Sequence, residues 1–277
     1  MVGLRPTTPP KETIMKNMKL ILGAFDAVTA RLCKQKGADY IWASSLVSSA
    51  IEGREDTGIT DAKVFSHFIE NLNKGFESVI VDFDIGGRHE EELYSNAKVM
   101  KELKVKGVCI EDEDFPKINA MIASEKRKLI DSNVMAKKLS IFREVLDESS
   151  LVIARTHSLI ANESLNELQD RVNVYSSAGA DVIVIHYTGG DWDYYEKTIS
   201  EINCSKPLMI LLSKEDRIPD QLSKIQNLEY IAFPNQLYRT MLGALVNIER
   251  QHMIEGKKWE KLITTDEFFN LISKQEV

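Results

Sequence analysis

The chain has 277 residues, of which 43% are hydrophobic and 28% charged, and its formal net charge at pH 7 is -7. This length and apolar content are typical of one α/β barrel domain spanning residues 1–277. The negative charge, without any basic block or basic stripe, argues against nucleic acid as a partner, and a small anionic ligand would need local positive charge.

The order of apolar and amphipathic segments predicts a barrel. After a loose lead-in over 1–17, strands are expected at 19–24, 39–43, 78–82, 107–111, 151–155, 181–186, 207–212 and 228–232. Helices are expected between most of them, at 26–36, 61–74, 90–104, 132–146, 164–178 and 193–202. Strands buried on both faces and joined by right-handed helical crossovers indicate a TIM-type (β/α)₈ barrel. A doubly wound open sheet is the alternative.

Extra helices are expected beyond the eighth strand, in the region 235–277. One is predicted over 235–256 and another over 265–272, where Phe268, Phe269 and Leu271 form an apolar face that needs a partner. These helices predict a homo-oligomer in which they pack on a neighbouring subunit.

The compartment is expected to be the cytoplasm. The N-terminal segment has no apolar run of signal-peptide length, and no segment approaches the roughly 20 apolar residues of a membrane span. Three well-separated cysteines suggest neither a disulfide framework nor a zinc site.

Acidic residues end two neighbouring strands. Asp82 and Asp84 follow a Val-Ile-Val run and are two residues apart, so both should leave the same face of the strand, and Glu111 ends the next strand. Three converging carboxylates would repel one another unless a cation lay between them. Oxygen ligands favour Mg²⁺, with Mn²⁺ as an alternative. The simpler interpretation of any one of these acids is a turn residue.

Other strands also end in polar residues, some neutral and some basic. Ser44 and Ser45 follow the second strand, Arg155 the fifth and His186 the sixth. A buried guanidinium is suited to bind a carboxylate or phosphate, whereas His186 has an equally plausible structural role. The remaining histidines, His67, His89, His157 and His252, are expected to be bystanders, and Trp42 and Cys109 are most simply packing residues.

Two long connections are candidate ligand-binding loops. The segment 44–58 (SSLVSSAIEGREDTG) is rich in small residues and contains Asp56, and the segment 112–128 (DEDFPKINAMIASEKRK) is long, charged and a candidate lid. A solvated surface loop is the alternative for the second segment.

Taken together, five strings resemble the phosphoenolpyruvate mutase/isocitrate lyase superfamily. They are IWASSLVSSAIEGREDTG, VDFDIGG, CIEDEDFPKIN, IARTHSLIA and SAGADVIVIH, in this order, and the similarity runs from about Gly23 to the C-terminal helices. The resemblance implies a Mg²⁺-dependent isomerase that interconverts phosphoenolpyruvate and phosphonopyruvate, as in phosphonate biosynthesis. The alternatives are a phosphonopyruvate hydrolase, a lyase or decarboxylase acting on a related 2-oxo acid, and a non-catalytic metabolite-binding barrel.

The lid sequence favours the mutase branch. The lyase branch has a catalytic cysteine in its lid, and this lid contains none. The mutase pattern is EDK, five variable residues, then Asn, and here Glu111, Asp112, Lys117 and Asn119 are preserved while Glu113 replaces the first lysine. The related hydrolases tend to lack this asparagine.

The resemblance also implies a dimer or tetramer, with C-terminal helices swapped between subunits, and roles for individual residues. Asp82, Asp84 and Glu111 would bind the metal directly or through water, and Asp56, Lys117 and Asn119 would be catalytic. The small anionic substrate, a 2-oxo acid or enol phosphate, would contact these residues: Trp42, Ser44, Ser45, Leu46, Arg155 and His186.

Two departures from the family pattern lie near these positions. Ile85, Gly86, Gly87, Arg88 and His89 stand where the family usually continues TGYGN after the acid, and Glu113 adds negative charge to the lid, where it would weaken anion binding or alter lid closure.

Overall fold

The eight predicted strands form a closed parallel barrel in chain order, with β1 paired to both β2 and β8. The computed structural model describes residues 18–58, 61–122, 127–215, 217–246 and 263–273. The strands are β1 (Lys19–Gly23), β2 (Tyr40–Ala43), β3 (Val79–Asp82), β4 (Gly107–Glu111), β5 (Leu151–Thr156), β6 (Val182–Ile185), β7 (Leu208–Leu211) and β8 (Leu228–Phe233). The TIM-type barrel is confirmed, and the open sheet was the wrong alternative.

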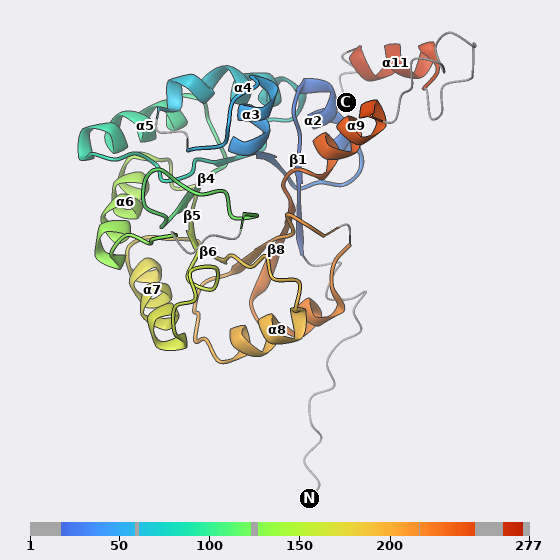
Figure 1. Cartoon of the computed structure of the whole chain (residues 1–277). Helices are drawn as coiled ribbons and strands as arrows, with labels where there is room; N and C mark the ends of the chain where they lie inside the picture. The colour runs from blue at the N-terminus through green and yellow to red at the C-terminus, as the bar shows by residue number, and fades with distance from the viewer. Residues whose placement is uncertain (1–17, 59–60, 123–126, 216, 247–262, 274–277) are drawn as a thin grey trace, which may run out of the picture.

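Helices surround the barrel (Figure 1). They are α2 (Ala27–Gln35), α3 (Ser45–Ile51), α4 (Ala62–Gly75), α5 (Glu90–Glu102), α6 (Ser132–Val145), α7 (Leu165–Ser177) and α8 (Trp192–Ser200), with a 3₁₀ helix η1 (Asp220–Lys224) between β7 and β8. Local sequence sets where several of them begin. Asp26 and Ser164, for example, each form a reciprocal capping box with the residue three positions later.

The prediction of an irregular loop over 44–58 was wrong in its first half. Residues Ser45–Ile51 form α3, and Ser44 is its N-cap, accepting a hydrogen bond from the Val47 amide at 3.4 Å. The serines that suggested a loop are tolerated in a short helix because one of them caps it and the others are buried against the barrel.

The C-terminal helices α9 (Gln236–Val246) and α11 (Thr265–Ile272) lie outside the ring, near α2 (Figure 1). Arg31 of α2 donates hydrogen bonds to the carbonyls of Leu271 at 2.5 Å and Ser273 at 3.2 Å. Neither helix contains a buried residue, and Phe268 and Phe269 are 48% and 57% exposed. The predicted helix over 235–256 is described only to residue 246, and the lead-in over 1–17 lies outside the described residues.

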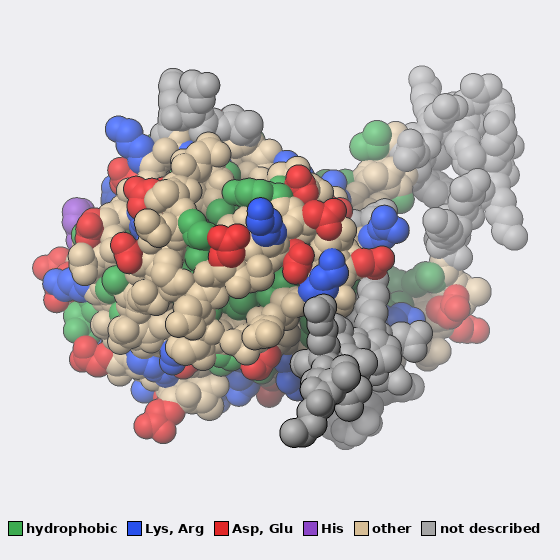
Figure 2. Space-filling model, turned by 90° about the horizontal axis from the view of Figure 1, so that it is seen from below, with side chains coloured by type: hydrophobic (Ala, Val, Ile, Leu, Met, Phe, Trp, Pro, Cys, Tyr) green, Lys and Arg blue, Asp and Glu red, His purple; other side chains and the backbone are tan. Residues whose placement is uncertain are grey.

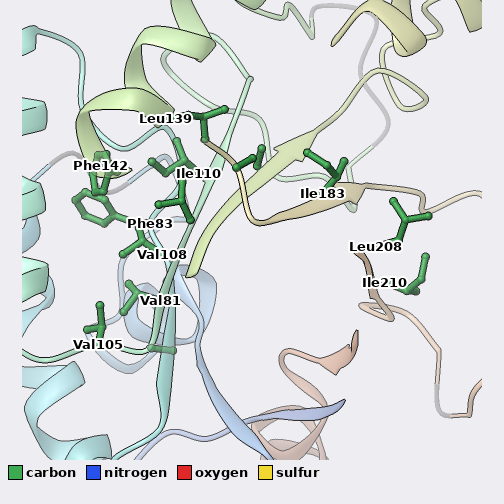
Figure 3. Packing of buried hydrophobic residues seen from close by; sticks show 14 of the residues in the cluster. Val81, Phe83, Val105, Val108, Ile110, Leu139, Phe142, Ile183, Leu208 and Ile210 are labelled. Atoms are coloured by element: carbon green, nitrogen blue, oxygen red, sulfur yellow. The ribbon is translucent and has the colours of Figure 1, made fainter. Parts of the chain in front are cut away.

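Two apolar clusters hold the barrel together. Inward-facing side chains, including Trp42, Ile80, Cys109 and Ile153, fill the barrel interior. Outward-facing side chains pack under the helices, as Figure 3 shows for Val81, Val108 and Ile110 of the strands with Leu139 and Phe142 of α6. This division leaves only the ends of the strands for polar side chains.

Basic side chains do not cluster on the described part of the face that Figure 2 shows, as the sequence predicts. Acidic and basic side chains are interspersed over the described part of that face (Figure 2). Within the described residues, no helix is both long enough and apolar enough to cross a membrane.

Candidate active site

Strand alternation directs polar side chains into the carboxyl-terminal mouth of the barrel. In β3, Ile80 lies in the interior cluster and Val81 in the outer one, so Asp82 faces inward again. By the same alternation in β4, Cys109 faces inward and so does Glu111, two residues later. Three further residues follow inward-facing positions of their strands in the same way: Ser44, Arg155 and His186.

These side chains surround a cavity of about 40 Å³. At roughly 10–15 Å³ for each enclosed water, this space suits three or four waters or an ion with a small ligand. The cavity brings together most of the residues singled out in the sequence: Ser44, Ser45, Leu46, Asp56, Asp82, Glu111, Lys117, Asn119, Arg155 and His186.

Two of the predicted site residues do not line the cavity. Trp42 is completely buried in the cluster that fills the barrel interior, below the mouth, so packing is the interpretation that the structure supports for it. Asp84 lies behind the lining residues, where its carboxylate accepts a hydrogen bond from the Ser45 hydroxyl at 2.7 Å. Asp84 has a positive φ of 44°, a left-handed conformation that aspartate tolerates better than most residues.

Arg155 pairs with the two acids that face the cavity. Its Nη1 lies 3.1 Å from Oδ1 of Asp82, and its Nη2 forms an ion pair with Glu111, its register partner across β4 and β5. Burial raises the pKa of Asp82, and the guanidinium of Arg155 opposes this shift. Arg155 therefore favours the charged form of Asp82 against the effect of burial.

Lys117 of the lid contacts the other two acids of the site, Asp56 and Asp84. Its Nζ lies 2.5 Å from Oδ1 of Asp84, 3.0 Å from Oδ1 of Asp56 and 3.3 Å from the Ser45 hydroxyl. Burial acts to lower the pKa of Lys117, but Asp84 and Asp56 outweigh burial and raise it above its ordinary value. Asn119 donates to Oδ2 of Asp56 at 2.6 Å, so two lid residues hold one carboxylate.

At the mouth of the barrel, carboxylates outnumber cationic side chains, which favours binding of a divalent cation. In the part of the chain that the structure describes, four carboxylates, of Asp56, Asp82, Asp84 and Glu111, form ion pairs with two cationic side chains, those of Lys117 and Arg155. Within the described residues, Oε1 of Glu111 has no hydrogen-bond partner, whereas Oδ1 of Asp82 and Oε2 of Glu111 are in ion-pair contact with Arg155. Buried oxygens of this kind are the ligands that Mg²⁺ prefers, so the cavity-facing pair of acids fits the metal expected from the sequence.

A second set of candidate ligands overlaps this pair. Glu111, Glu113 and His157 each place a ligand atom within 4.8 Å of the others. Glu113, however, is already paired with Arg127, and neither Glu113 nor His157 lines the cavity. Of these three residues, Glu111 is the one that lines the cavity.

Glu113 is an internal anchor of the lid rather than an added charge at the site. Its buried carboxylate accepts hydrogen bonds from the Ile118 amide at 2.7 Å and from Arg127, and it contacts Nδ1 of His157 at 2.7 Å. Arg127 also donates to the carbonyls of Ile118 and Asn119, at 2.8 and 3.1 Å. The segment 112–128 is thus braced through its buried residues Asp112, Glu113, Lys117 and Arg127, and the solvated-loop alternative was wrong for these four. Other described residues of the segment are exposed, as that alternative expected: Asp114, Phe115, Pro116, Ile122 and Lys128.

The expectation that His157 is a bystander was wrong. It is completely buried beside the site, with Nε2 at 3.1 Å from Nδ1 of His186, whose other nitrogen, Nε2, has no hydrogen-bond partner among the described residues. Burial, together with the nearby Arg155, lowers the pKa of both imidazoles well below the usual range. The two rings are therefore neutral at pH 7.

The departure after β3 folds away from the cavity. Lys138 of α6 donates to the carbonyls of Ile85 and Gly87 at 2.8 and 2.9 Å, and Asn96 of α5 donates to that of Gly86 at 2.9 Å. Ile85, Gly86, Gly87 and Arg88 do not line the cavity, and Arg88 lies over the ring of the lid residue Phe115, 5.2 Å from its centroid.

Sequence reasoning missed several residues of the site. The cavity is also lined by Leu211 and Ser213 at the end of β7 and by Asn235 after β8. The strand-end pattern that located the other residues extends to these two strands. Nothing in the sequence, by contrast, pairs Glu113 with Arg127 or His157, because these contacts depend on how the lid folds back.

Comparison with known proteins agrees with this architecture. A family model described as phosphoenolpyruvate phosphomutase matches residues 13–253. The chain is 24% identical over 250 residues to a phosphoenolpyruvate phosphomutase of Tetrahymena pyriformis, which covers 89% of this chain and 83% of the relative. It is 28% identical over 200 residues to a 2-methylisocitrate lyase of Halalkalibacterium halodurans, with 72% and 64% covered. A crystal structure of phosphoenolpyruvate phosphomutase from Streptomyces platensis subsp. rosaceus has the same fold, with a TM-score of 0.84 at 22% identity, and the match covers 94% of this chain and 93% of that one.

Proposed function

The chain belongs to the phosphoenolpyruvate phosphomutase family, and from this membership we propose that it is an isomerase that interconverts phosphoenolpyruvate and phosphonopyruvate with bound Mg²⁺. The observation that carries the proposal is the way Asp56 is held. Its carboxylate lies in the cavity lining, fixed by Lys117 at 3.0 Å and Asn119 at 2.6 Å, both from the lid.

The arrangement suits transfer of a phosphoryl group within one bound molecule. Such a transfer passes through a metaphosphate-like state that needs mainly positioning and charge neutralisation. Asp56 would lie beside the migrating group, as transient acceptor or positioning group, while the C–P bond of phosphonopyruvate breaks and an O–P bond to the enolate oxygen forms. The lid would exclude water, since a captured water would give pyruvate and phosphate instead.

The remaining residues would bind and orient the substrate. Arg155 would hold an anionic group, and Ser44, Ser45 and Leu46 would shape the pocket. Asp82 and Glu111 would hold Mg²⁺, with Asp84 behind them, and the metal when bound would neutralise charge on the substrate oxygens. The enclosed volume favours a small 2-oxo acid or enol phosphate over a larger ligand.

Phosphorus NMR of the purified protein with phosphonopyruvate and Mg²⁺ tests the proposal. Formation of phosphoenolpyruvate is expected, and Asp56→Ala should abolish it. Asp170→Ala, which removes an exposed carboxylate on α7, is the matched control and should leave turnover unchanged. Inorganic phosphate as the sole product would instead indicate a hydrolase, and turnover of oxaloacetate or a substituted malate alone would indicate a lyase.

We also propose that the chain forms a homo-oligomer through α9 and α11. The support is the exposed apolar surface of these helices, which includes Leu245, Phe268 and Phe269, because such surface usually packs on a partner. Light scattering after size exclusion should give a mass above 31.4 kDa, and a monomer would contradict this proposal.

A further inference from the structure

The turn at residues 85–87, directly after Asp84, is held by side chains that come from outside the site. Lys138 of α6 donates hydrogen bonds to the first and third carbonyls of this turn, at 2.8 and 2.9 Å, and Asn96 of α5 donates to the second, at 2.9 Å. Both donor residues are buried, with 7% and 4% of their surface exposed. Together these two side chains form the turn clamp.

The turn has a backbone conformation that depends on its surroundings. Asp84 and Gly86 have positive φ values of 44° and 75°, and a residue other than glycine keeps such a conformation where the contacts around it hold it there. The turn is also packed tightly, because a Cβ on Gly86 would lie 3.1 Å from Cγ2 of Ile110 and 3.4 Å from Cε2 of Phe142, both labelled in Figure 3. The turn clamp and this packing therefore keep Asp84 in its left-handed conformation.

Asn96 is suited to its position because it meets one donor and one acceptor. The amide of Ala62, at the start of α4, donates to Oδ1 of Asn96 at 3.0 Å, while Nδ2 donates to the carbonyl of Gly86. A backbone N–H only donates and a carbonyl only accepts, so these partners fix which end of the side-chain amide faces the turn. An ionised aspartate has the same shape but could not donate to the carbonyl.

We propose that Asn96 and Lys138 are positioning residues of the site, which act through Asp84 without contacting the ligand. Neither of them lines the cavity. Asp84, however, lies 2.5 Å from Nζ of Lys117 and accepts a hydrogen bond from the hydroxyl of Ser45 at 2.7 Å, and both of these residues do line it. A displacement of Asp84 would therefore release two side chains of the cavity wall at once.

The kinetic consequence rests on the proposed function. Lys117 also pairs with Asp56 at 3.0 Å, so the position of Asp84 affects the carboxylate that is proposed to lie beside the migrating phosphoryl group. Loss of the turn clamp should lower kcat about 10- to 100-fold, the usual effect of losing a partner that orients a site residue. KM should change less than about threefold, because the interaction acts mainly in the transition state.

Hydrogen exchange of the full chain, measured by mass spectrometry without Mg²⁺ or substrate, tests the structural part of the inference. Asn96→Asp keeps the size and the acceptor but removes the donor to Gly86, so peptides covering residues 83–88 should exchange about tenfold faster or more. Asn73→Asp is the matched control, because Asn73 of α4 also donates to a carbonyl, that of Leu103 at 3.0 Å, at the far end of α5. It should leave these peptides and kcat unchanged.

Lys138→Met provides a second test, because it removes the other two hydrogen bonds of the turn clamp without adding a buried charge. It should increase the exchange of residues 83–88 and lower kcat in the same way as Asn96→Asp. Wild-type exchange at residues 83–88 in both variants would overturn the inference, and so would exchange that rises equally in all barrel strands.

The kinetic measurements separate positioning from simple packing. Faster exchange of the turn with an unchanged kcat, or an equal loss of kcat in Asn73→Asp, would show that the turn clamp does not position the site. If the wild type does not convert phosphonopyruvate but the exchange results are as expected, the proposed function fails and the structural link from the turn clamp to Asp84 stands.

Discussion

Arg127 is the residue whose removal should loosen the lid without affecting the barrel. In Arg127→Met, the buried Glu113 carboxylate loses its counter-ion, and the carbonyls of Ile118, Asn119 and Ile122 lose a common donor. The side chains of Arg127 and Glu113 are each only 1% exposed, so solvent does not screen their interaction.

The size of the effect follows from this burial. Leaving one partner of a buried ion pair uncompensated costs about 3–5 kcal/mol. The lid can avoid that cost by opening and hydrating Glu113, because the segment is a loop and is not part of the sheet. Since each 1.4 kcal/mol is a factor of ten, we expect the lid amides to lose about 100-fold or more of their protection against hydrogen exchange.

Hydrogen exchange measured by mass spectrometry provides the assay. Peptides covering Ile118 to Ile122 should exchange faster in Arg127→Met, while peptides of β4 and β5 should not change. Arg143→Met is the matched control, because Arg143 also joins a carboxylate, that of Asp181 at 2.9 Å, to backbone carbonyls, but next to the amino-terminal ends of β5 and β6.

Two outcomes would refute the reasoning. Lid exchange equal to that of the wild type would show that Arg127 does not brace the lid. Faster exchange spread evenly over all barrel strands would show that the ion pair supports the whole fold and has no specific link to the lid.

Three further predictions concern the metal, the lid and a buried lysine. Asp82→Ala should lower Mg²⁺ affinity and turnover together, as measured by calorimetric titration and phosphorus NMR, and an unchanged metal dependence would remove Asp82 from the site. Asn119→Ala should spare Mg²⁺ binding but reduce turnover at least tenfold, because Asp56 loses the 2.6 Å hydrogen bond that orients it, and equal loss of both would contradict a lid role. Burial lowers the pKa of Lys138 from 10.5 to about 8, so between these pH values the unfolded chain binds more protons than the folded one. The stability of the wild type relative to Lys138→Met should therefore rise across that window, by up to about 3 kcal/mol in urea unfolding, and a pH-independent difference would contradict the shift.

Much of the site was predictable because strand alternation is a local rule. Once Ile80 and Cys109 are assigned to the barrel interior, Asp82 and Glu111 must face the mouth, and the closed barrel brings Arg155 beside Glu111. The same rule applied to β7 and β8 gives Ser213 and Pro234, which line the cavity as well.

Contacts between distant segments were not predictable in this way. Trp42 has the same parity as Ser44 but lies one layer deeper, so it packs inside the barrel instead of reaching the cavity. The serines after Ser44 suggested a loop, and their burial against the barrel allows the short helix α3.

By itself, the sequence determined the closed barrel and the polar residues at its mouth, because periodicity and strand ends are encoded within a few neighbouring positions. Only the tertiary structure decided the roles of Glu113, Arg127 and His157. The role of a buried carboxylate depends on the cation and the imidazole that contact it. Those partners come from separate segments of the chain, and no local sequence pattern specifies that they meet.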